Sequence, residues 1–325
     1  MPSASDTGTG RTRTVARYAL SLTLMVLILV VLIHSVEPGN LIDAFHGLQL
    51  PYFIAATCLH VFVVFIVSPL LWLAILAHLG CRPPLKTVYQ IWIGMFCLRA
   101  VLPFKSGGVV GANYLRLTEG LPLTRGIGSL GLMHFMNFYS LWAYLVFGLF
   151  WTGKGGLLLP VLLTFVLAAV PVALPWMNVV ARLGGRLHPR LGEILGNLIS
   201  AFTDIPLIPR LLLFGIVLLF QCMDLFVIGF GLRGAGIVVP PADLFLCVPV
   251  VYLIANLPIT FMGLGTREAT LVFVFAPFGS QAMILAAGIG LSFCMEIVPA
   301  LFSLFYLPKA IAMGLFSHRP DEEGS

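Results

Sequence analysis

Two short segments, one in each half of the chain, interrupt apolar runs that are otherwise long enough to span a membrane. The first covers residues 102–108 and the second residues 257–268, and each combines Pro and Gly with charged side chains. Irregular backbone is tolerated at membrane depth only where protein buries it or water reaches it. A matched pair of interrupted segments is also the best sequence indicator of a transporter's binding site. We therefore expect a site for a charged ligand inside the membrane.

The composition identifies an integral membrane protein. Of the 325 residues, 59% are hydrophobic and only 10% are charged, whereas soluble domains average about 25% charged residues. The net charge of +5 is no signal for nucleic acid, because Arg and Lys concentrate in loops, as cytoplasmic loops of membrane proteins require. The six cysteines are scattered singly, so neither a disulfide framework nor a metal site is predicted.

Six apolar stretches are predicted to cross the membrane fully, since a crossing needs about 20 residues. Their approximate bounds are 18–36, 51–79, 125–150, 157–176, 210–232 and 281–308. Between the first two we expect a short polar loop that holds Glu37, Asp43 and His46. A secretory signal competes for the first stretch, but no small-x-small cleavage site follows it, so we expect an uncleaved anchor.

Three polar segments complete the predicted organisation. Residues 1–14 and 316–325 are expected to be cytoplasmic tails, the first of them disordered, around a single membrane domain at 15–315. Within that domain, residues 178–208 alternate basic and apolar side chains at three- and four-residue steps. This pattern predicts an amphipathic helix on the membrane surface.

The two interrupted regions, at about 87–123 and 243–279, are interpreted as re-entrant hairpins. If both crossed fully, some basic loops would lie outside, whereas two re-entrant hairpins keep both termini and the basic loops in the cytoplasm. Aligning Pro103 with Pro258 also superimposes Gly108 on Gly263, which favours an inverted repeat. The predicted fold is therefore all-α and polytopic, with about six full spans and two re-entrant hairpins, in the cell inner membrane.

Arg267 and Glu268 form the strongest candidate site at the second break. They follow Gly263 and Gly265, where bare backbone N–H groups can bind an anion, and a guanidinium suits bidentate phosphate binding. The alternative is that the two charges pair with other groups and hold the break in place.

The first break supplies a second set of candidate ligand-binding residues, namely Lys105, Gly107, Gly108 and Arg116. For Arg116 the alternative is a side chain that extends to the interface.

Two further carboxylates, Asp224 and Glu296, lie inside predicted spans. Ionisable groups at membrane depth are functional candidates by default. A lone carboxylate there either pairs with an arginine or carries a proton, because burial favours its neutral form. No nucleophile–base pair, metal-ligand spacing or nucleotide-binding motif is present, so we predict neither an enzyme nor a cofactor.

Two blocks of sequence resemble the transmembrane-domain family of lysylphosphatidylglycerol synthase. The first block spans 103–116 and 120–123, and the second spans 257–269. The family's Gly-x-Gly-x-Arg-Glu pattern maps onto Gly263, Gly265, Arg267 and Glu268. Many members have a Gly-acid step before the arginine of the first block, but no acid precedes Arg116 here.

The resemblance implies a polytopic membrane protein that moves lipids or lipid-linked intermediates between leaflets. Without the soluble aminoacyl-transferring domain, the chain is not expected to synthesise lysyl-lipid. The expected substrate has an anionic head group, and the phospholipid, polyprenyl-phosphate and hopanoid classes all remain open. Two alternatives are a membrane enzyme acting on lipid-linked sugars or phosphates, and a scaffold for a partner glycosyltransferase.

Overall fold

Helices are the only regular elements among the residues that the computed structural model describes. These are 6–101, 107–157, 202–257 and 260–306, together with 159, 161, 162, 196, 199 and 200, and no strand occurs among them. Four helical runs are long and apolar enough to cross a membrane: Leu50–His78, Leu123–Trp151, Leu207–Gly234 and Gln281–Leu304. They coincide with four predicted spans and confirm a multi-pass, all-helical protein.

The predicted count of six spans stays a prediction. Nearly all of the predicted span 157–176, most of the surface helix 178–208 and the C-terminal tail 316–325 lie outside the described residues.

The described residues form two compact units. Unit 1 comprises the described residues within 1–60, 138–165 and 219–297, and unit 2 those within 61–137, 166–218 and 298–325. The principal helices are α1 (Asp6–Ser35), α2 (Pro38–His46), α3 (Leu50–Phe62), α4 (Ser68–His78), α5 (Leu85–Val101), α6 (Gly107–Glu119), α7 (Leu123–Trp151), α11 (Leu207–Gly234), α12 (Pro241–Ala255), α13 (Thr266–Phe275), α14 (Gln281–Ser292) and α15 (Val298–Leu304). Short helical turns are η1 (Val63–Val67), η3 (Gly155–Leu157), η4 (Phe261–Gly263), η5 (Ala276–Phe278) and η6 (Phe293–Ile297).

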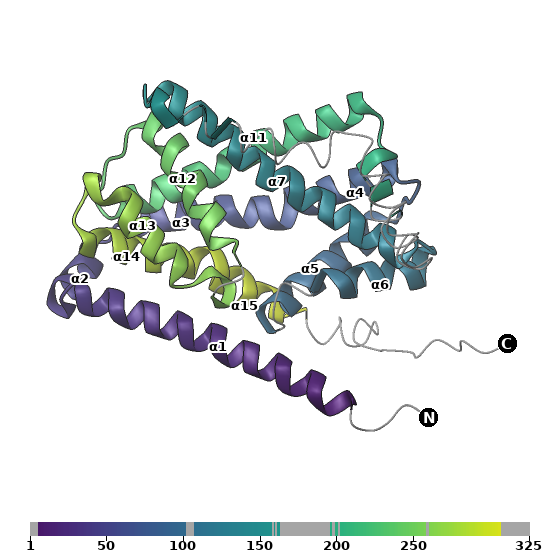
Figure 1. Ribbon diagram of the computed structural model, residues 1–325, viewed down its shortest axis with the longest axis horizontal. Helices are drawn as coiled ribbons and strands as arrows, with labels where there is room; N and C mark the ends of the chain where they lie inside the picture. The colour runs from purple at the N-terminus through teal and green to yellow at the C-terminus, as the bar shows by residue number, and fades with distance from the viewer. Residues whose placement is uncertain are drawn as a thin grey trace. The chain divides into compact units, whose positions relative to one another are not determined.

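The first helix differs from its prediction at both ends. Helical backbone starts at Asp6, inside the stretch assigned to a disordered tail, and the expected polar loop after it is mostly the helix α2 (Figure 1). The axes of α1 and α2 differ by 90°. Pro38 explains the bend, because a proline disfavours helical backbone in the residue before it, and Glu37 has a φ of 62°. The apolar side of α2 packs against α14 through Leu41 and Leu285.

Two spans contain a π-helical turn that is followed by a proline. The turn η1 lies between α3 and α4, and Pro69 comes two residues after it. The turn η6 lies between α14 and α15 and is followed in the same way by Pro299. A proline cannot donate to the carbonyl four residues earlier and its ring clashes with it, so a widened turn relieves both problems. Such turns occur frequently at functional sites.

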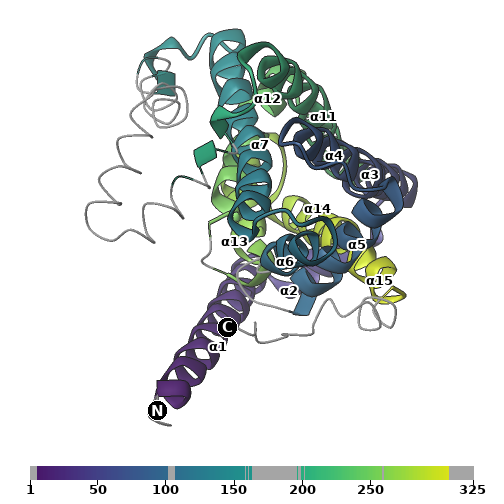
Figure 2. The same ribbon diagram turned by 90° about the vertical axis from the view of Figure 1, so that its right-hand side faces the viewer.

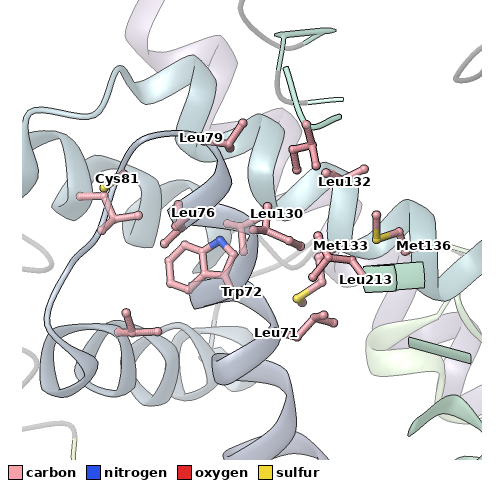
Figure 3. Packing of buried hydrophobic residues seen from close by; sticks show 14 of the residues in the cluster. Leu71, Trp72, Leu76, Leu79, Cys81, Leu130, Leu132, Met133, Met136 and Leu213 are labelled. Carbon is pink, nitrogen blue, oxygen red and sulfur yellow. The ribbon is translucent and has the colours of Figure 1, made fainter. Parts of the chain in front are cut away.

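Unit 2 is built around Trp72 of α4. Its indole is fully buried, packs among Leu76 and Leu130 (Figure 3), and donates from Nε1 to the hydroxyl of Ser129 at 2.9 Å. The hydrogen bond satisfies the only polar atom of the ring, so the side chain contributes its apolar area to the core at no desolvation penalty.

Each unit contains one helical hairpin at a position where the sequence predicts an interrupted segment. In unit 2, α5 lies beside α6 (Figure 2), and in unit 1, α12 lies beside α13 (Figure 1). Their lengths are 17, 13, 15 and 10 residues, all below the roughly 20 that a crossing requires. Both predicted hairpins therefore exist as pairs of short helices.

Candidate functional site

The second break is a tight reversal of the backbone between α12 and α13. Met262, Gly263 and Gly265 all have positive φ, at 55°, 76° and 84°. A Cβ atom on Gly263 would lie 2.6 Å from the carbonyl oxygen of Ala255, so only glycine fits at that position. The sequence Gly-x-Gly is thus required by the path of the chain.

Glu268 holds this reversal together. Its side chain is 1% exposed, and its Oε2 accepts the N–H of Gly265 at 2.5 Å, which satisfies one of the N–H groups left over at the start of a helix. Its Oε1 accepts the hydroxyl of Ser292 on α14. Both oxygens are occupied, so the carboxylate attaches the break to α14.

Replacing Glu268 with Gln is expected to lower the free energy of unfolding by about 1.5–3 kcal/mol, because hydrogen bonds to a charged acceptor are lost. SDS titration in mixed micelles measures this quantity. The control is Glu119→Gln at the exposed end of α6, which should change it little. Equal stability of the two variants would contradict the role assigned to Glu268.

Arg267 is buried and paired inside unit 1. Its Nη2 donates to Oε1 of Glu296 at 3.0 Å, and the two side chains are 5% and 9% exposed. The same nitrogen lies 3.4 Å from the carbonyl oxygen of Met262, and Nη1 lies 3.8 Å from Sδ of Met295. Two of the predicted site residues are therefore brought together, and η6 supplies the carboxylate that neutralises the arginine.

Asp224, the other carboxylate predicted in a span, lies near a histidine rather than an arginine. Its Oδ1 is 3.8 Å from Nδ1 of His60, and its Oδ2 accepts a hydrogen bond from Gln221 at 2.6 Å. No role is predicted for His60 from the sequence, although its place inside an apolar run is a usable signal. Nothing in the sequence marks Ser292 as the partner of Glu268.

The residues of the first break belong to unit 2. Gly107 and Gly108 begin α6, and a Cβ on Gly108 would lie 3.2 Å from Leu130 of α7. This glycine therefore permits close helix packing. Arg116 is half-buried in the last turn of α6, and Lys105 lies outside the described residues.

An open cavity of about 860 Å³ also lies in unit 1, lined by residues 35–37, 40, 43, 44, 47, 235, 236 and 280–283. None of the predicted site residues lines it. Among the described residues, no group of three His, Cys, Asp or Glu side chains is placed to hold a metal ion.

Comparison with known proteins bears on this arrangement. The model of the lysylphosphatidylglycerol synthase TM region matches residues 16–302, which is nearly the whole chain and includes both breaks, the Arg267–Glu296 pair and Asp224. Neither a curated protein nor a solved structure gives a significant match. The chain belongs to the family of the lysylphosphatidylglycerol synthase transmembrane region.

Proposed function

We propose that this protein moves a lipid with an anionic head group between the two leaflets of the cell inner membrane, with both termini in the cytoplasm. Family membership ties the chain to lipid handling. The observation that carries the proposal is the buried Arg267–Glu296 pair beside an irregular backbone reversal. An ionised pair at membrane depth is expensive to maintain and marks a functional site by default.

The pair suits reversible binding of a phosphate. Carboxylate and phosphate both accept the parallel N–H donors of a guanidinium, so a head group can replace Glu296 at Arg267 without leaving the arginine unpaired. In the absence of substrate, Glu296 prevents the large penalty of a buried, uncompensated charge. The proposed exchange involves no covalent step, and the protein acts as a transporter rather than an enzyme.

The two short hairpins support a mechanism of alternating access. We infer that the α5–α6 and α12–α13 pairs are re-entrant, and that each reaches toward the membrane midplane from its own side. Transporters built from inverted repeats bind substrate near the midplane at discontinuous helices. The first hairpin would open to the cytoplasm and carry Arg116 as a phosphate ligand within unit 2, and the second would open to the outside.

Exchange of labelled lipids between leaflets tests the proposal. Purified protein in liposomes is expected to accelerate exchange of a fluorescent phosphatidylglycerol, and Arg267→Gln is expected to remove at least nine tenths of that rate. The matched control is Arg233→Gln, at an exposed arginine in the last turn of α11, which should retain the wild-type rate.

Three other outcomes are informative. Wild-type exchange by Arg267→Gln would exclude this arginine as the head-group ligand, and wild-type exchange by Arg116→Gln would remove the second ligand. No exchange with phospholipid, polyprenyl-phosphate or hopanoid probes would overturn the transport proposal. It would favour an enzyme acting on lipid-linked substrates or a scaffold for a partner membrane enzyme.

A further inference from the structure

A second polar site lies in unit 1, where His60 of α3 faces Asp224 of α11. The two side chains are 13% and 15% exposed. Their facing atoms, Nδ1 of His60 and Oδ1 of Asp224, are buried and have no hydrogen-bond partner among the described residues. Both residues lie in the middle of helices that are apolar enough to span a membrane. An unsatisfied nitrogen and a half-satisfied carboxylate at that depth need an explanation.

A single proton would satisfy both atoms. The separation of 3.8 Å exceeds the length of a hydrogen bond, and a neutral imidazole nitrogen without hydrogen offers a carboxylate only another lone pair. The neutral Nδ1–H tautomer and the imidazolium both place a hydrogen between the two atoms, and only the imidazolium also balances the charge of the Asp224 carboxylate. Histidine gains and loses a proton in the physiological pH range more readily than other side chains.

The titratable groups around this site extend toward Arg267. From α7, α11 and α12, the titratable groups around Asp224 are Tyr144, Cys222 and Tyr252. The hydroxyl of Tyr252 has no hydrogen-bond partner among the described residues.

Tyr252 also lies within electrostatic range of Arg267 and Glu296, and Arg267 within range of Glu268. From η6, Cys294 contacts the carbonyl oxygen of Phe53 on α3. Tyr252 is therefore the group through which the electrostatic surroundings of Asp224 and of Arg267 overlap.

We propose that the His60–Asp224 pair binds a proton that is transported together with the anionic lipid. The proton adds to Nδ1 of His60 on one side of the membrane and leaves from the same atom on the other. A phosphate at Arg267 brings negative charge into unit 1, and the proton carried by His60 compensates one unit of it. This inference rests on the proposed function and adds its energy source.

A pH difference across the vesicle membrane tests the coupling. If one proton accompanies each lipid, one pH unit supports a steady-state ratio of up to about tenfold between leaflets, with labelled phosphatidylglycerol enriched on the alkaline side. Protein-free vesicles correct for spontaneous movement of the probe. His60→Gln and Asp224→Asn are each expected to bring the ratio to about one, with gel filtration confirming that both variants are folded.

Matched controls are His78→Gln in the last turn of α4 and Asp43→Asn on the exposed side of α2, which should keep the wild-type ratio. Exchange by the wild type with a ratio of one, or enrichment on the acidic side, would overturn proton co-transport and leave the transport proposal intact. Wild-type ratios in both His60→Gln and Asp224→Asn would exclude this pair as the proton site. Absence of exchange altogether would overturn the proposed function, and the coupling with it.

Discussion

Arg267→Met and Glu296→Met are each expected to destabilise the protein more than the double replacement does. Each single variant leaves one buried charge without its partner, at a cost of about 3–5 kcal/mol in the free energy of unfolding. Two methionines fill a similar volume with apolar atoms, and such replacement of a whole buried pair is often neutral or stabilising. SDS titration of the four proteins in the cycle measures the coupling energy between the two side chains.

The same four proteins separate folding from function. Arg267→Met and the double variant both lack the guanidinium, so neither should exchange lipid, even though the double variant regains most of its stability. A double variant whose loss equals the sum of the two single losses would show that the pair does not form. Lipid exchange by the stable double variant would show that the pair is only structural.

Gly263→Ala is expected to disrupt the second hairpin. A left-handed backbone with a Cβ and a contact of 2.6 Å with the carbonyl oxygen of Ala255 together cost about 2–5 kcal/mol. Unlike the end of a flexible side chain, this carbonyl is part of the backbone at the end of α12, so it has little freedom to move away. Unfolding by SDS titration should begin earlier in this variant, and lipid exchange should fall with it.

The control for this replacement is Gly131→Ala in α7, where no atom lies within 4 Å of the added Cβ. This change should be neutral or stabilising by up to about 1 kcal/mol, since alanine is the better helix former. If the two variants have the same stability, the left-handed conformation at Gly263 is not present in the folded protein.

The lengths of the apolar runs predicted the long helices, because the thickness of the membrane sets the length of a spanning helix and tertiary contacts do not. The run at 51–79 became Leu50–His78 and the run at 210–232 became Leu207–Gly234. The segment 37–49 was predicted as a loop because its many polar residues hide the helical spacing of the apolar residues that pack on α14. The π-turn η6 was not predicted, since its nearest signal, Pro299, is equally compatible with a kink.

The candidate site was predicted in part. Gly-x-Gly followed by Arg-Glu indicated a buried arginine at a backbone reversal, and the structure has both. The partners could not be predicted, because Glu296 and His60 are distant in sequence from Arg267 and Asp224. Spacing alone could not distinguish Glu268, which holds the break to α14, from Glu296, which neutralises the arginine.

The winding of η6 has a mechanical consequence for the Arg267–Glu296 pair. A π-turn accommodates one more residue than an α-helical turn, and one residue corresponds to about 100° around a helix axis. Rewinding η6 as regular α-helix would therefore rotate Glu296 away from Arg267 while α14 stays in place, held to the break by Glu268. In the proposed transport cycle, a change in helical register over five residues would then expose the guanidinium to an arriving head group.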